Sequence, residues 1–371
     1  MSSPKETIRK ILAAADVRID GERAWDIRVR NEQFYERVLS GGSLGLGESY
    51  MDGWWETEAL DQCIFRIVRA GLNTSLVPRF SAAMAWLKST LLNLQSKRRA
   101  PGNIHRHYDL STRLYLSFLD PYNQYTCGYF KSVDDLNKAQ EQKLELICKK
   151  LRITSADEVL DIGCGWGGFA KLASERYGCH VTGITISDEQ FEYARNYTRD
   201  LPVTILKEDY RDLSGKFDKV LVCGMFEHVG FKNHRELMRV VHRSLKEEGL
   251  FLLHTIGGKV STKFIDPWIG TYIFPNTLLP SAKQITEAIE GLFLVEDWQN
   301  FGAFYDQTLL AWFRNFDKNW EKVRADFDER FYRMWKYYLL ACAGLFRARE
   351  TQLWQVVLSK NGLLGGYQPA R

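Results

Sequence analysis

Hydrophobic residues follow two different spacings along the chain, and the change of spacing separates two regions. The first 80 residues favour helices, with amphipathic stretches at 7–15 and 31–39 and a short strand-like alternation at 27–29. From about residue 109, short apolar strands alternate with amphipathic helices. The expected strands are 158–162, 180–184, 203–206, 219–223 and 250–255, and the expected helices are 169–177, 189–198 and 233–245. This alternation predicts an α/β fold, in which a parallel sheet carries helices on both faces.

Three further stretches complete the pattern. Residues 41–55 are rich in glycine, which predicts a turn region held by Trp54 and Trp55, or alternatively a contact with an acyl chain or headgroup. Residues 308–357 predict long aromatic-rich helices. Within them, the apolar run 337–346 has half the roughly 20 residues that a membrane span needs. We therefore expect a buried helix there, and the polar first ten residues predict no export signal.

Composition narrows the class of protein. The 371 residues are 45% hydrophobic and 26% charged, which is typical of a globular chain of about two domains. The 13% of aromatic residues suits a large core or a protein that handles a greasy substrate. Seven scattered cysteines form no C-x-x-C pair. We therefore expect no disulfide framework and no metal site, which favours a reducing cytosol.

The net charge of +4 is concentrated in one segment. Residues 1–80 sum to −1, residues 81–113 sum to +5 and the remaining 258 sum to zero. The basic side chains of that segment are Lys88, Lys97, Arg98, Arg99, Arg106 and Arg113. An apolar stripe at helical spacing precedes them, so the segment suits either an anionic membrane surface or a packed linker with solvated charges. So small a net charge does not favour nucleic acid as a partner.

The strongest local motif is the glycine loop Val159-Leu-Asp-Ile-Gly-Cys-Gly-Trp-Gly-Gly168, which follows a predicted strand. Glycines there let a ligand approach the backbone, and the next helix offers free N–H groups. A nicotinamide dinucleotide needs an acid at the end of the second strand, but none precedes Asp188. Asp161 stands directly before the loop instead, which is typical of S-adenosylmethionine sites. A nicotinamide oxidoreductase stays an alternative that a binding assay with both cofactors would decide.

Six segments, in order from about residue 20 to the C-terminus, resemble the bacterial cyclopropane fatty acid synthase family. They are Gly45-Leu-Gly-Glu-Ser-Tyr-Met-Asp-Gly-Trp-Trp55, His107-Tyr-Asp-Leu110, Tyr125-Thr-Cys-Gly-Tyr-Phe130, the glycine loop, Gly224-Met-Phe-Glu-His-Val-Gly230 and Cys342-Ala-Gly-x-Phe-Arg347. The resemblance implies a class I S-adenosylmethionine-dependent methyltransferase sheet, Rossmann-like with added helices, and a small, mainly helical N-terminal domain. It also implies transfer of a methylene from S-adenosyl-L-methionine to the cis double bond of phospholipid acyl chains, which closes a cyclopropane ring.

The resemblance assigns the cofactor site residue by residue. Gln190 takes the ribose contact, which explains the missing acid, and Thr126 stands where the family more often has serine. The implied cofactor-binding residues are Tyr125, Thr126, Asp161, Gly163, Gly165, Gly167, Thr185, Ile186, Gln190, Tyr210 and Arg211.

The resemblance also implies that a bound bicarbonate ion is the proton acceptor. Its holders would be Cys127, Glu227, His254, the Ile256 backbone and Tyr305. The residues alone support this in part, because Glu227 follows one predicted strand and His254 ends the next, at the carboxyl edge of the sheet. His228 suits a core position equally well. Cys342 is a further catalytic candidate in this family, although methyl transfer to an alkene needs no covalent enzyme intermediate.

The resulting organisation has three parts: a lipid-binding and dimerisation domain at 1–80, a basic linker at 81–108 and a catalytic domain at 109–371. The expected partners are phospholipid with unsaturated acyl chains, an anionic membrane surface and a second copy of the chain in a homodimer. The expected location is the cytoplasm, peripheral on the inner face of the membrane. The alternatives are a sister methyltransferase that makes methyl-branched or oxygenated acyl chains, and a non-catalytic lipid-binding protein.

Overall fold

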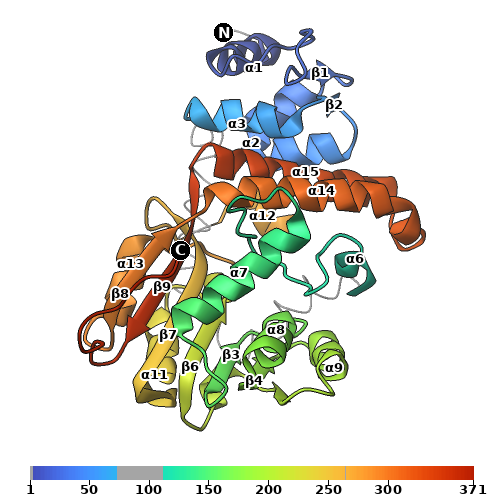
Figure 1. The fold of residues 1–371 in the computed structure, drawn as a ribbon. Helices are drawn as coiled ribbons and strands as arrows, with labels where there is room; N and C mark the ends of the chain where they lie inside the picture. Colours follow the sequence, from blue (N-terminus) through green and yellow to red (C-terminus); the bar gives the residue numbers. More distant parts are fainter. Residues whose placement is uncertain (1–2, 73–111, 264) are drawn as a thin grey trace. The chain divides into compact units, whose positions relative to one another are not determined.

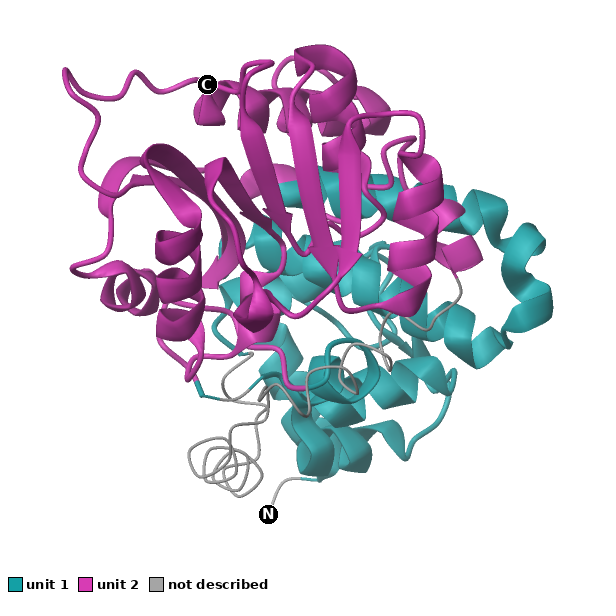
Figure 2. Cartoon of the chain, turned by 90° about the horizontal axis from the view of Figure 1, so that it is seen from below, with its two compact units in different colours: residues 1–92, 263–275, 305–351 teal, residues 93–262, 276–304, 352–371 magenta. Residues whose placement is uncertain are grey.

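The computed structural model describes residues 3–72, 112–263 and 265–371, which form two compact units. The first unit comprises residues 1–92, 263–275 and 305–351, and the second comprises 93–262, 276–304 and 352–371 (Figure 2). The compact units therefore differ from a division of the chain at residues 80 and 108, because late helices pack with the N-terminal ones. The division by function stays a prediction, and the basic linker lies outside the described residues.

Helices dominate the first unit (Figure 1). A two-stranded sheet accompanies them, formed by β1 (Arg28–Val29) and β2 (Trp55–Glu56), so the strand expected at 27–29 is confirmed. Its helices are α1 (Pro4–Ala14), α2 (Phe34–Met51), α3 (Leu60–Arg69), α12 (Pro267–Tyr272), α14 (Ala303–Val323) and α15 (Glu329–Arg347). Helix α14 begins two residues before the third segment of the unit, which starts at Tyr305.

The turn region expected at residues 41–55 is wrong, since helix α2 continues to Met51 with one interruption at Gly42 (φ 57°, ψ −130°). The glycines on its second half serve close packing. A Cβ on Gly45 would lie 2.1 Å from the Arg37 carbonyl oxygen, and one on Gly47 would lie 2.3 Å from the Trp268 ring. Small side chains thus let the helix approach its neighbours. Of the two tryptophans expected to hold this region, Trp55 is fully buried and Trp54 is only partly buried.

The C-terminal aromatic stretch forms α14 and α15, but the expectation of helices up to residue 357 is wrong in its last part. Residues Thr351–Ser359 form strand β9. The pattern there is a run of β-branched and aromatic residues with every position from Leu353 to Ser359 buried, which suits a central strand. The apolar run 337–346 is confirmed as part of a buried helix. In the described part of the chain, no helix is long and apolar enough to cross a membrane.

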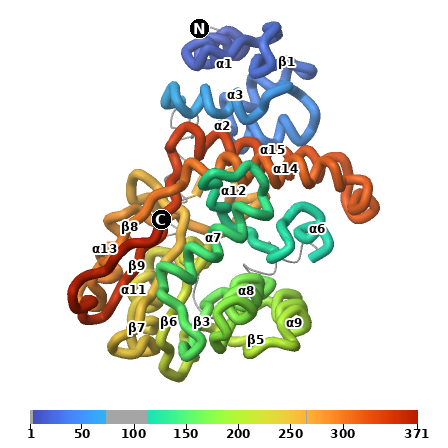
Figure 3. Tube along the Cα trace, in the orientation of Figure 1, coloured from blue at the N-terminus to red at the C-terminus, as the bar shows by residue number. Residues whose placement is uncertain are grey.

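The second unit is built on a seven-stranded sheet in the order β5-β4-β3-β6-β7-β9-β8 (Figures 1 and 3). The five strands expected from the sequence pair in parallel with one another. The last two strands pair antiparallel, so the sheet is mixed rather than purely parallel. The bounds are β3 (Glu158–Ile162), β4 (His180–Thr185), β5 (Val203–Lys207), β6 (Phe217–Cys223), β7 (Leu245–Gly258) and β8 (Leu294–Asn300).

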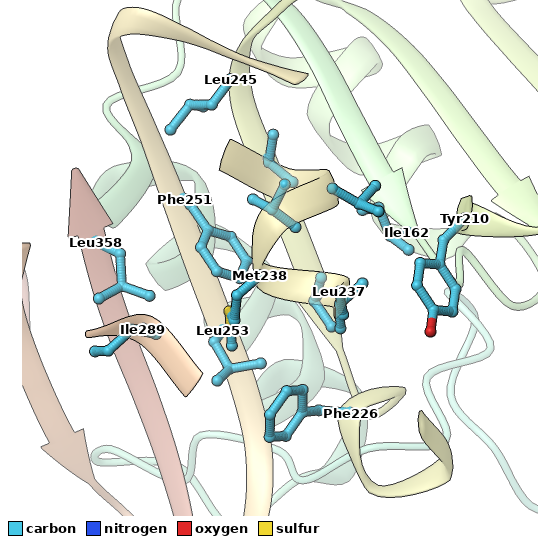
Figure 4. Packing of buried hydrophobic residues seen from close by; sticks show 14 of the residues in the cluster. Ile162, Tyr210, Phe226, Leu237, Met238, Leu245, Phe251, Leu253, Ile289 and Leu358 are labelled. Carbon is cyan, nitrogen blue, oxygen red and sulfur yellow. The ribbon is translucent and has the colours of Figure 1, made fainter. Parts of the chain in front are cut away.

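Helices cover both faces of this sheet, which confirms the expected α/β class. Alternate strand residues divide between two cores: Leu160 and Val220 face one, whereas Val159 and Leu221 face the other. Helices α11 (His234–Ser244) and α13 (Ala282–Ile289) supply the first core (Figure 4). Helices α7 (Leu136–Leu151) and α8 (Gly168–Tyr177) supply the second. Helices α6 (Thr112–Leu116), α9 (Asp188–Tyr197) and α10 (Phe226–Val229) complete the unit.

The strand order indicates where a ligand would bind. The chain starts the sheet at β3, goes outward through β4 and β5, and then returns to the other side of β3 with β6. The connections after β3 and β6 therefore leave the sheet in opposite directions. Such a switch point opens a crevice at the carboxyl ends of the strands, which is where α/β proteins bind ligands.

Candidate active site

A cavity of about 170 Å³ opens at this switch point. Residues that follow β3, β4, β5 and β6 line it, together with residues 123–126. All the cofactor-binding residues expected from the sequence line this cavity except Gly167. Their binding of a cofactor stays a prediction, but the structure brings them to one place.

The glycine loop lies between β3 and α8. Gly163 and Gly165 have φ angles of 83° and 55°, which residues with a Cβ atom adopt only with strain. A Cβ on Gly165 would meet nothing within 4 Å, so this backbone borders open space. Gly167 has another role: it precedes α8 with φ 80°, and its Cβ would lie 3.1 Å from that of Ala194. Its lack of a side chain therefore lets the loop pack on α9.

Asp161 is the last residue but one of β3, close before the glycine loop, and is 2% exposed. Burial raises the pKa of its carboxyl to about 7, while the positive charge of Lys143 opposes that rise. An ionised carboxylate here is costly in free energy unless a positive charge faces it. A ligand with an ammonium group would supply such a charge.

Two hydroxyls organise the end of β4. Thr185 Oγ1 donates to Gln190 Oε1 at 3.0 Å, and Ser187 Oγ accepts from the Gln190 N–H at 3.3 Å, which starts α9. Among the described residues, the side-chain N–H groups of Gln190 donate to no acceptor, so they could serve a ligand such as a ribose hydroxyl.

Sequence reasoning missed Glu208 and Asp209, which follow β5 and line the cavity. Asp209 pairs with Arg211 through Oδ2 and Nη1 at 3.1 Å. The rule that singled out Asp161 would have found them, because they too follow a predicted strand at the carboxyl edge of the sheet. His228 also lines the cavity, and its Nδ1 lies 3.0 Å from Thr277 Oγ1.

Glu227 and His254 are a second pair of buried polar residues near the cavity. Glu227 lies on α10 after β6, whereas His254 lies within β7, which continues to Gly258, so the expectation that His254 ends its strand is wrong. Both are nearly fully buried, with exposed fractions of 4% and 1%. Glu227 Oε1 accepts from the Ile256 N–H at 2.6 Å. Within the described residues, Glu227 Oε2 and His254 Nε2 have no hydrogen-bond partner. Two buried polar atoms without partners are costly to maintain and indicate a ligand.

Burial shifts the pKa values of both groups toward their neutral forms. The pKa of Glu227 rises to about 7, and the pKa of His254 falls well below its ordinary value, helped by the charges of Lys143 and Lys150. His254 is therefore a neutral imidazole. Its Nδ1 lies 3.3 Å from the amide nitrogen of Gln355, a donor that places the ring hydrogen on Nε2.

The structure brings only part of the expected anion site together. Cys127 is fully buried beside the cavity-lining Thr126, and its thiol donates to the Gly128 carbonyl oxygen at 3.2 Å. The Ile256 N–H already serves Glu227, so a bound ion would have to share it. Tyr305 belongs to the first unit, where its ring packs on Trp312 and Phe346. Its contribution to the anion site stays a prediction.

Cys342 lies on α15 in the first unit. Burial raises the pKa of its thiol to about 12, so the reactive thiolate is absent near neutral pH. This environment suits a small apolar core residue better than a nucleophile.

Comparison with known proteins identifies the family. The family model described as mycolic acid cyclopropane synthetase matches residues 95–356. The chain belongs to this family. It is 50% identical over 362 residues to the cyclopropane-fatty-acyl-phospholipid synthase of Escherichia coli, covering 98% of this chain and 94% of that protein. It is 30% identical to the tuberculostearic acid methyltransferase UfaA1 of Mycobacterium tuberculosis, covering 90% of this chain and 82% of that protein.

A solved structure supports the same assignment. The mycolic acid cyclopropane synthase CmaA1 in complex with SAH and CTAB has a TM-score of 0.66 and 29% identity, covering 70% of this chain and 98% of that one. The expected fold, a methyltransferase sheet of the S-adenosylmethionine-dependent class, is confirmed, and the chain is an enzyme of that class. The methyl donor is S-adenosylmethionine.

Proposed function

We propose that this enzyme transfers a methylene from S-adenosyl-L-methionine to the cis double bond of unsaturated acyl chains in membrane phospholipids, with a bound bicarbonate as proton acceptor. The observation that carries the proposal is the identity of 50% over nearly the whole chain to a synthase of this activity. Glu227 Oε2 and His254 Nε2, which are buried and have no hydrogen-bond partner in the described part of the chain, support the binding of the ion. An oxidoreductase would need an acid at the end of β4, where Thr185 and Gln190 stand instead.

The cavity suits the donor. S-adenosylmethionine supplies an electrophilic methyl group when bound. Asp161 would accept a hydrogen bond from the ammonium group of the methionine portion. The positive charge of that group would offset the free-energy cost of burying the ionised carboxylate. The Gln190 amide would donate to the ribose, and Tyr210 and Arg211 would border the adenine.

Ring closure requires a base that removes a proton from the transferred methyl group. The alkene attacks the methyl carbon, a C–C bond forms as the C–S bond breaks, and positive charge develops on the acyl chain. One proton then leaves the transferred methyl while a second C–C bond closes the ring. The net change is one CH₂ added to the chain and one proton released.

Glu227 and His254 would hold a bicarbonate for that step. Bicarbonate supplies a proton acceptor when bound. Neutral His254 would donate from Nε2 to an ion oxygen, and Glu227 Oε2 would accept from the ion's hydroxyl. Cys127, the Ile256 N–H and Tyr305 would complete the binding set. These protein groups would therefore hold and orient the ion, which would supply the proton acceptor.

A sister activity has one observation in its favour, namely the 30% identity to a tuberculostearic acid methyltransferase over most of both chains. Methyl transfer that leaves the chain unsaturated or branched differs from cyclopropanation in how the cation loses its charge. The products distinguish the two activities.

The experiment incubates the enzyme with vesicles of unsaturated phospholipid and methyl-labelled S-adenosylmethionine, followed by mass analysis of the acyl chains. We expect one CH₂ per modified chain, about 14 Da on atomic composition, with the alkene lost. A product that keeps its double bond or gains a hydroxyl would support the sister activity. No transfer to any lipid would contradict both.

A second experiment tests the ion. Activity should fall in carbonate-depleted buffer and recover on addition of bicarbonate. Glu227→Gln should lower turnover by about 10²-fold or more, as loss of a general base does, while cofactor affinity stays near normal. If depletion has no effect and Glu227→Gln is still inactive, Glu227 is itself the base.

The proposal also includes the membrane. The enzyme would bind the inner face of the membrane as a peripheral homodimer, through the N-terminal domain and the basic residues 97–99. Replacing these three by glutamine should weaken sedimentation with anionic vesicles at low salt, by up to about 3 kcal/mol at roughly 1 kcal/mol per charge. Unchanged binding would mean that the charges only face solvent.

A further inference from the structure

Helix α7 carries two lysines with no exposed surface, Lys143 and Lys150. A buried ammonium group is costly unless hydrogen bonds or opposite charges compensate it. Lys150 has such compensation in an ion pair, with Nζ at 3.2 Å from Asp297 Oδ2. Lys143 is compensated differently, by groups that belong to the wall of the cofactor cavity.

Lys143 holds two side chains of that wall. Its Nζ donates to Gln124 Oε1 at 2.5 Å and to Thr126 Oγ1 at 2.7 Å. Both acceptors line the cavity, on either side of Tyr125. One helical turn earlier, Gln140 Nε2 donates to the Thr126 carbonyl oxygen at 2.7 Å. Helix α7 thus fixes both the side chains and the backbone of residues 124–126.

The charge of Lys143 also acts on two buried carboxylates. Asp120 accepts from the backbone N–H groups of Tyr122 and Gln124, both at 2.8 Å, which shapes the turn that leads into the wall. Burial raises the pKa values of Asp120 and Asp161, and the positive charge of Lys143 opposes both shifts. Burial also lowers the pKa of Lys143 itself, so this lysine favours the ionised forms of the two carboxylates only while its amine is protonated.

We propose that Lys143 is a positioning residue for the cofactor: it fixes the wall 124–126 against the cavity. This inference rests on the proposed function only in naming the ligand as S-adenosylmethionine. Lys143 does not line the cavity, so it acts through Gln124 and Thr126 rather than by contact with the cofactor. Loss of Lys143 should therefore weaken cofactor binding even where the fold survives.

The test compares Lys143→Met with Lys150→Met by titration calorimetry with S-adenosylhomocysteine. The two variants remove the same charge from the same helix, and both residues are fully buried. Lys143→Met should lower the affinity about 10- to 100-fold, because it leaves the two wall acceptors, Gln124 Oε1 and Thr126 Oγ1, without their donor. Lys150→Met should lower the melting temperature but leave the affinity within about 2-fold of wild type. Amide exchange over residues 120–127 should rise in Lys143→Met only.

The outcomes separate this inference from the proposed function. If wild-type protein does not bind S-adenosylhomocysteine, the proposed function fails and Lys143 has no cofactor to position. If wild type binds and folded Lys143→Met binds equally well, the inference is overturned. Equal losses in both lysine variants would also overturn it, since they would indicate a general effect of stability. Should Lys143→Met fold poorly, Lys143→Leu, which also lacks the donor, serves for the same measurement.

Discussion

Glu227 should make the folded protein less stable as the pH rises, and Glu227→Gln should remove that effect. The pKa of this carboxyl rises from an ordinary value of 4.5 to about 7 on burial. In the folded protein the group therefore holds its proton over a pH range in which the unfolded chain has already lost it. The unfolded state binds fewer protons there, so the free energy of unfolding falls with increasing pH between about 4.5 and 7.

The magnitude follows from the same shift. Each tenfold change in proton affinity is worth ~1.4 kcal/mol, so the complete effect is about 3 kcal/mol above the folded pKa. Glutamine cannot ionise but can still accept from the Ile256 N–H. We therefore expect Glu227→Gln to match wild type in stability near pH 4.5 and to exceed it by up to about 3 kcal/mol at pH 8. Asp161 titrates in both proteins, so its contribution cancels in the difference.

The assay is urea unfolding of both proteins at pH 5, 6, 7 and 8 in carbonate-free buffer. A difference that grows with pH supports the reasoning, whereas one that stays constant across this range would refute it. Turnover of the same variant, measured separately, should be lower by about 10²-fold or more. Together these results would show that a residue needed for activity costs stability in the free enzyme.

Three further predictions concern other parts of the molecule. Gln355→Leu removes the donor to His254 Nδ1 and should lower kcat about 10-fold without changing affinity for S-adenosylhomocysteine; an equal loss of affinity would indicate a structural effect. Cys342→Ala should keep most of the activity in the acyl-chain assay. A folded but inactive variant would show that the Cys342 thiol has a catalytic role. Gly47→Ala should destabilise the protein by about 1–3 kcal/mol in thermal unfolding, because the added carbon meets the Trp268 ring. Gly41→Ala on the same helix, with open space around it, is the control and should be neutral or stabilising by up to ~1 kcal/mol.

The sequence by itself determined the core of the second unit. Strands such as 158–162 and 219–223 are short apolar runs between amphipathic helices, and this local pattern leaves few alternatives to a parallel sheet covered on both faces. The glycine loop could also be recognised from the sequence, because backbone positions with φ > 0 are occupied mainly by glycine. Asp161 and the loop glycines were singled out by their place after a predicted strand, whereas the other proposed cofactor-binding residues came from the family resemblance.

Tertiary structure decided what local patterns leave open. Residues 41–51 are helical because Gly45 and Gly47 fit against Arg37 and Trp268, contacts that a composition of turn-forming glycines does not reveal. Residues 351–359 form a strand because antiparallel pairing with β8 overrides a helical reading of the aromatic stretch. Lys143 is an ordinary helix-surface lysine by sequence, and only the packing of α7 on residues 124–126 makes it a buried cation. Burial and pairing depend on segments far apart in the chain, so these roles arise only in the folded molecule.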